Sequence, residues 1–85
     1  MDKVLKQLKS IKESIDLNIS TLKNLVKQSI EFEELINDLA KANASQETKD
    51  KFVKIKDEID KDVDALIKST QKLFKSYEEL VKEMF

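Results

Sequence analysis

Apolar side chains recur along this chain at alternating steps of four and three residues. The first run comprises Val4, Leu8, Ile11, Ile15, Leu22, Leu25, Phe32, Ile36 and Leu39, and the second comprises Phe52, Ile59, Val63, Leu66, Leu73, Tyr77, Leu80 and Met84. This spacing keeps the apolar residues on one side of an α-helix and is typical of coiled-coil heptads. We therefore predict two long helices, over about residues 2–42 and 46–84, each with one such row, called its seam below.

The seam stops between Leu39 and Phe52. The intervening residues include nothing apolar larger than alanine, and the spacing of thirteen residues breaks the heptad phase, which would place equivalent positions fourteen apart. Asn43 and Ser45 are both favourable helix N-caps, so we place a turn at about residues 42–46. The alternative is one unbroken helix about 120 Å long with a heptad defect, because the chain contains neither Gly nor Pro.

The register of the two halves favours the hairpin. Folding about residue 44 places residue i opposite residue 88 − i, so that the termini finish level and apolar seam residues face one another. In this register Asn18 meets Thr70, and both interrupt the seams. An amide and a hydroxyl in one layer can hydrogen-bond, and a buried polar seam residue can fix register and oligomer state. Simple tolerance of polar residues is the other interpretation of the four interruptions, which are Asn18, Ser29, Lys56 and Thr70.

Further apolar residues lie beside the seam on one flank of each predicted helix. They are Leu5, Ile19 and Val26 in the first helix, and Val53, Ile67, Phe74 and Val81 in the second. An apolar stripe of this width suits a helix with two neighbours. We therefore predict an all-α fold, in which an antiparallel two-helix coiled-coil hairpin pairs into a four-helix bundle. These seven residues are its predicted partner interface, and the expected partner is a second copy or another helical protein.

Composition excludes most catalytic and ligand-binding chemistry. The 85 residues include no Gly, Pro, Cys, His, Trp or Arg. Disulfides, Cys or His metal sites, His-dependent catalysis and glycine-rich phosphate loops therefore cannot be built. We expect no enzyme, no cofactor and no bound metal. The net charge of −1, from sixteen Lys against seventeen Asp and Glu, argues against a nucleic-acid or anionic-membrane binder.

Charge is unevenly distributed along the chain. Residues 1–30 carry six Lys against three acidic residues, whereas residues 31–64 carry eleven acidic residues against six Lys. The open end of the hairpin is thus basic and the turn end acidic. Antiparallel packing of two hairpins brings unlike ends together, which biases their orientation.

Two carboxylate clusters are candidate metal sites. They are Asp57, Asp60 and Asp64, and Glu31, Glu34 and Asp38. The first cluster lacks the Gly and the final Glu of a calcium-binding loop, and the second lacks the His of di-iron helices. We interpret both clusters as solvated helix faces.

The expected size, hairpin topology and helical partner resemble the small Trp-x-Gly hairpin proteins of type VII secretion. Phe74 followed four residues later by Glu78 loosely matches the aromatic–acid spacing of their export tail, whereas residues 42–45 contain neither Trp nor Gly. The resemblance implies export together with a second helical protein.

We predict a non-enzymatic protein–protein interaction module, a self-associating hairpin acting as an adaptor, assembly or structural subunit. The alternatives are a partner protein of a type VII-like secretion system and a phage-type inhibitor that docks on a host protein. No apolar run approaches the roughly 18 residues of a membrane span, and residues 1–6 lack the hydrophobic centre of a signal peptide. We expect a soluble, cytoplasmic protein without membrane insertion, and export without a signal peptide stays open.

Overall fold

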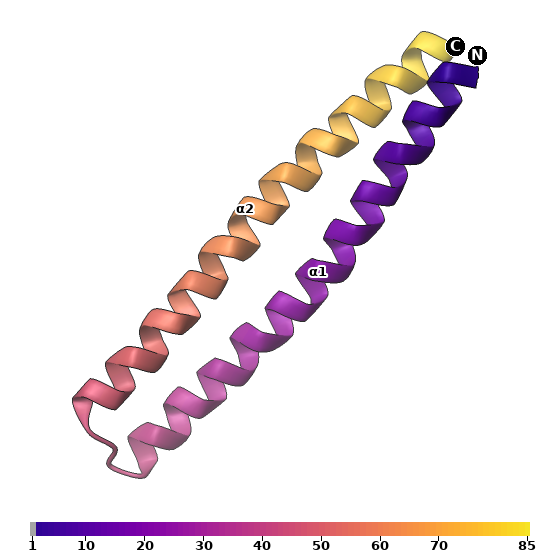
Figure 1. The fold of residues 1–85 in the computed structure, drawn as a ribbon. Helices are drawn as coiled ribbons and strands as arrows, with labels where there is room; N and C mark the ends of the chain where they lie inside the picture. Colours follow the sequence, from indigo (N-terminus) through magenta and orange to yellow (C-terminus); the bar gives the residue numbers. More distant parts are fainter. Residues whose placement is uncertain (1) are drawn as a thin grey trace.

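The computed structural model describes residues 2–85 and consists of two long α-helices joined by residues 42–45 (Figure 1). α1 spans Asp2–Lys41 and α2 spans Gln46–Met84. The helices lie side by side in opposite directions, with the two chain ends together at one end of the molecule. Its dimensions are 63 × 15 × 14 Å. The all-α class and the hairpin are therefore confirmed, and the alternative of one unbroken helix is wrong.

The seams of α1 and α2 face each other along the hairpin. All seam residues, including the four polar ones, are at least partly buried. Among residues 2–85, only Ile15 and Thr70 are buried, with 6% and 7% of their surface exposed. Two helices provide no third layer, so water reaches the edges of most seam side chains. The hairpin alone thus forms a thin core. Chains of this length usually need stabilisation beyond such a core.

An aromatic pair joins the two helices near the turn. The ring centroids of Phe32 and Phe52 lie 5.9 Å apart, with an angle of 42° between the ring planes. This is within the range preferred by interacting aromatic rings. The pair therefore fixes the spacing of α1 and α2 just before the connection.

The end of α1 is a Schellman motif built on Asn43. The amide of Ala44 donates to the carbonyl of Leu39 at 3.0 Å, and the amide of Asn43 donates to the carbonyl of Ala40 at 3.3 Å. This pairing satisfies carbonyls at the end of the helix and requires a left-handed residue. Asn43 has a φ of 56°, a conformation that Asn tolerates better than most residues. The chain therefore turns without a glycine.

Ser45 begins the second helix. Its backbone is extended, and its Oγ accepts a hydrogen bond from the amide of Thr48 at 3.2 Å, which is the geometry of an N-cap. Glu47 lies in the first turn, where a carboxylate interacts favourably with the helix dipole. Of the two N-cap candidates, Ser45 takes this role and Asn43 instead ends α1.

Candidate interaction surface

The seven residues predicted as the partner interface occupy equivalent positions on the two helices. Each directly follows a seam residue, as Ile19 follows Asn18 and Phe74 follows Leu73. Because α1 and α2 run antiparallel, residues that directly follow these seam positions lie on the same side of the hairpin. Ile19 and Phe74 accordingly line one hollow. We call this side, formed by Leu5, Ile19, Val26, Val53, Ile67, Phe74 and Val81, the apolar flank.

Most of the apolar flank is open to water. Six of its residues are exposed, including Phe74 at 48% and Leu5 at 51%, whereas Val81 is half-buried. Each of these six keeps at least 38% of its surface exposed. Scattered exposed apolar residues are normal on a protein surface, but a contiguous set on one side indicates an interaction site.

The opposite flank consists of the residues that directly precede every second seam residue, beginning with Leu8 on α1 and Lys56 on α2, and it is mostly polar. Its members are Gln7, Ser14, Thr21, Gln28 and Leu35 on α1, and Ile55, Asp62, Ser69, Ser76 and Glu83 on α2. Leu35 and Ile55 are its two large apolar residues, and both lie near the turn. Ile55 is not among the residues predicted from the sequence, although its place directly before the seam residue Lys56 points to it. The two flanks therefore differ clearly in polarity.

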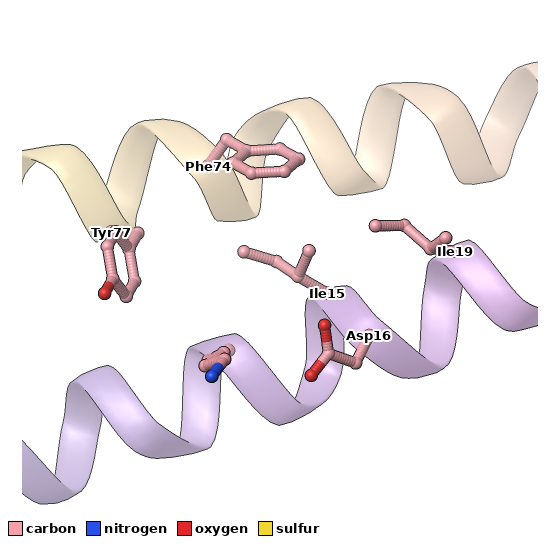
Figure 2. A pocket seen from close by; sticks show the side chains of 6 residues that line it. Ile15, Asp16, Ile19, Phe74 and Tyr77 are labelled. Atoms are coloured by element: carbon pink, nitrogen blue, oxygen red, sulfur yellow. The ribbon is translucent and has the colours of Figure 1, made fainter.

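A shallow hollow of about 260 Å³ lies on the apolar flank between the helices (Figure 2). Phe74 and Tyr77 from α2 face Ile15 and Ile19 from α1 across it. Lys12 and Asp16 complete its lining. The hollow thus has apolar walls and a charged rim, and it is large enough to admit an apolar side chain.

Three charged residues share the apolar flank with the apolar side chains. Lys12, Glu33 and Asp60 each lie seven residues after a member of the flank, namely Leu5, Val26 and Val53, and so occupy the same heptad position. Lys12 lies in the half of the hairpin nearer the termini, whereas Glu33 and Asp60 lie in the half nearer the turn. The flank therefore carries opposite charges at its two halves.

Asn18 and Thr70 form a hydrogen-bonded polar layer in the seam. Asn18 Nδ2 donates to Thr70 Oγ1 at 3.2 Å, and Thr70 Oγ1 donates to the carbonyl of Leu66 at 2.7 Å. The hydroxyl therefore uses its proton within α2 and accepts the amide of α1 with its oxygen. The structure thus brings together the two residues that the hairpin register paired. Their influence on oligomer state stays a prediction.

The other two polar seam residues meet at Asp60. Ser29 Oγ donates to Asp60 Oδ1 at 2.6 Å, and Lys56 Nζ donates to Asp60 Oδ2 at 2.8 Å. The hydrogen bonds from Lys56 and then Ser29 lower the pKa of the Asp60 carboxyl, and the bond to Asp60 raises the pKa of Lys56. Their spacing in the sequence does not reveal this shared acceptor, because Asp60 lies on the flank and outside the seam.

The carboxylate clusters do not assemble into a metal site within residues 2–85. No group of three or more acidic side chains in that range lies close enough to share an ion. Asp60 contacts Ser29 and Lys56 instead, while Asp57 and Asp64 are exposed to water. Glu31, Glu34 and Asp38 are likewise exposed along α1.

Comparisons of the chain with protein families, curated proteins and solved structures found no match. Over residues 2–85, neither helix contains an apolar stretch long enough to cross a bilayer.

Proposed function

We propose that this hairpin is a non-enzymatic protein–protein interaction module that self-associates through its apolar flank. Two hairpins would pack flank to flank and form a four-helix bundle, with coiled-coil packing within and between them. The observation that carries this proposal is the sidedness of the hairpin, because one flank exposes six large apolar residues while the other is mostly polar. A single apolar side favours one defined docking surface.

The energetics of the flank support association. Complete burial of a large apolar side chain contributes about 1.5–3 kcal/mol. The flank residues are already partly covered by the hairpin, so a second hairpin would add about half of this for each. Summed over both copies, the gain is large enough to offset a substantial part of the cost of association. It would also thicken a core in which Ile15 is the one buried apolar residue among residues 2–85.

The role that fits such a bundle is an adaptor, assembly or structural subunit. The side chains available are those of Lys, carboxylates, amides and hydroxyls, without the His or Cys on which most catalytic constellations depend. A different helical protein with a matching apolar side would dock on the same flank, so a heterodimer uses the same surface.

Light scattering coupled to size-exclusion chromatography tests the proposal. At micromolar concentration we expect a mass of about 20 kDa, twice the 9.9 kDa of one chain. The variant Ile67→Glu/Phe74→Glu should elute as a monomer that keeps most of its helical circular dichroism. Its matched control, Leu17→Glu/Leu35→Glu, changes two apolar residues that are also exposed but lie off the flank, and should stay dimeric.

Two results would contradict the proposal. A wild-type monomer throughout the micromolar range would exclude self-association at useful concentrations. A dimer that survives the change at Ile67 and Phe74 but is lost in the control would assign association to the opposite side of the hairpin.

A further inference from the structure

We infer that the second copy docks head-to-tail, about a two-fold axis between Ile19 and Ile67, so that Val26 of each copy enters the hollow beside Phe74 of the other. This inference rests on the proposed self-association and adds its orientation and register. It follows from the order in which the apolar side chains, the hollow and the charged side chains occur along the flank.

The internal register of the hairpin gives all flank residues a common scale. Residue i of α1 lies level with residue 88 − i of α2, as the hydrogen bond between Asn18 and Thr70 illustrates. The contact between Ser29 and Asp60 agrees within one residue. We give each α2 residue a level, which is the number of the α1 residue beside it. Phe74 therefore lies at level 14, Ile67 at level 21 and Asp60 at level 28.

A two-fold axis at level 20 brings complementary features of the two copies to the same level. Phe74 at level 14 of one copy becomes level with Val26 of the other, which sets the hollow of one copy against a branched apolar side chain of the other. Ile19 and Ile67 lie one level on either side of the axis and pack across it. Leu5 of one copy becomes level with Val53 of the other in the same way. The axis is close to the midpoint of the hairpin, so the two copies overlap along nearly their whole length.

The same axis pairs the charges of the flank. Lys12 at level 12 of one copy becomes level with Asp60 of the other, so each dimer would contain two such pairs. Lys12 lies on the rim of the hollow, and Asp60 remains 45% exposed despite its contacts with Ser29 and Lys56. A carboxylate has about four lone-pair sites, which leaves capacity for a third donor. One pairing is unfavourable, because Glu33 of one copy becomes level with Val81 of the other, the half-buried member of the flank.

A parallel dimer lacks this complementarity. It would set Lys12 against Lys12 and Asp60 against Asp60, and like charges in contact are unfavourable. It would also set the two hollows against each other, with no side chain to fill either one. The flank therefore favours the head-to-tail orientation.

A charge-exchange cycle in the full chain tests this register. Lys12→Glu and Asp60→Lys should each raise the dimer dissociation constant about tenfold, because two contacts become repulsive. The combined variant restores unlike charges and should return to within about threefold of the wild type. Within one hairpin the two positions lie about 24 Å apart along the axis, well beyond the screening length. Coupling between them must therefore arise across the two copies.

The matched control cycle uses Lys6→Glu and Asp62→Lys, which make the same charge changes on exposed residues away from the flank. These variants should show no coupling. Asp60→Lys also removes the contacts with Ser29 and Lys56, so its circular dichroism confirms that the hairpin remains folded. The coupling is the difference between the effect of the combined variant on dimer dissociation and the sum of the two single effects. The local effect of Asp60→Lys is present in both quantities and therefore cancels.

A distance measurement separates the orientation from association itself. The chain has no Cys, so Glu47→Cys accepts one spin label near the turn. Head-to-tail packing should give a distance between labels on the order of 60 Å, whereas parallel packing should give less than about 25 Å. A dimer with the short distance and no charge coupling would overturn this inference while self-association stands. A monomeric wild type would overturn both.

Discussion

The hydroxyl of Thr70 accepts the amide of Asn18 at 3.2 Å while donating its own proton to the carbonyl of Leu66 at 2.7 Å. The two partners of this layer are therefore not equivalent. Without Asn18, the hydroxyl keeps its bond within α2. Without the hydroxyl, the amide of Asn18 loses its hydrogen-bond partner among residues 2–85.

This asymmetry predicts unequal costs for the two single substitutions. Thr70→Val should lower the free energy of unfolding by about 1–2 kcal/mol, because it leaves a half-buried amide unpaired. Asn18→Leu should cost less than about 1 kcal/mol, because Thr70 keeps its bond to Leu66 and the seam gains an apolar residue. Urea denaturation of both variants and of their combination measures the coupling.

The matched control for this cycle is Thr21→Val. Thr21 makes the same kind of bond to a carbonyl four residues earlier, that of Leu17, but it is exposed. The control should change stability by less than about 0.5 kcal/mol. Purely additive effects of Asn18→Leu and Thr70→Val would show that the hydrogen bond contributes nothing to the register.

A pH dependence follows from the contacts of Asp60. Its folded-state pKa lies below the ordinary 3.8, so its contribution to stability is complete above that value and is lost as the pH falls through the folded pKa. Lys56 has a pKa above the ordinary 10.5, so its contribution is complete below that value and is lost as the pH rises through the folded pKa. Stability from this cluster should therefore be constant between about pH 4 and 10.

Asp60→Asn provides the measurement for the acidic side. The wild type should have the higher unfolding temperature at neutral pH. The difference should shrink as the pH falls below 3.8 and disappear below the folded-state pKa of Asp60, where its carboxyl is protonated in the folded and unfolded states alike. In Lys56→Met, an NMR titration should find the pKa of Asp60 closer to its ordinary value. An unchanged pKa in that variant would rule out Lys56 as the principal cause.

The left-handed backbone of Asn43 predicts opposite effects for Gly and Ala. Asn43→Gly should hold or raise stability, whereas Asn43→Ala should lower it by about 1 kcal/mol, because a Cβ without a polar group is disfavoured at positive φ. The control is Ala42→Gly, one residue earlier, where φ is negative and glycine should be destabilising. Thermal unfolding by circular dichroism would distinguish these signs. A stable Asn43→Ala variant would mean that the turn adopts another conformation.

Removal of the N-cap hydroxyl of Ser45 should destabilise the start of α2. Ser45→Ala removes the acceptor for the amide of Thr48 and should cost about 0.5–2 kcal/mol of unfolding free energy. Ser45→Asp should retain the cap and keep the stability close to that of the wild type. If Ser45→Ala is as stable as Ser45→Asp, water replaces the cap without cost.

The regular part of the fold could be predicted from the sequence because one period determines it. The alternation of steps of three and four residues fixes which side of each helix is buried, and the heptad break near residue 44 locates the turn. The level of Asn18 opposite Thr70 then follows from the same register. Each of these features depends on spacing alone, which the sequence displays directly.

The irregular part depends on side-chain geometry that spacing does not specify. Asn43 and Ser45 are both reasonable N-caps in sequence, and only the left-handed φ of Asn43 separates their roles. Asp60 lies outside the seam, yet it accepts from both Ser29 and Lys56 because its carboxylate reaches across the groove. The hollow beside Phe74 likewise requires the positions of side chains from both helices.

The hairpin topology also has a kinetic consequence. Phe32 and Phe52 are separated by twenty residues along the chain, whereas seam partners near the termini are separated by about eighty. Closing the longer loop costs more entropy, so we expect folding to begin at the turn and to spread toward the termini as each new layer shortens the next closure. Substitutions at Phe52 should then slow folding, whereas substitutions at Leu80 should chiefly accelerate unfolding. We therefore expect the helices to pair first beside the Schellman turn and to separate first at the two termini.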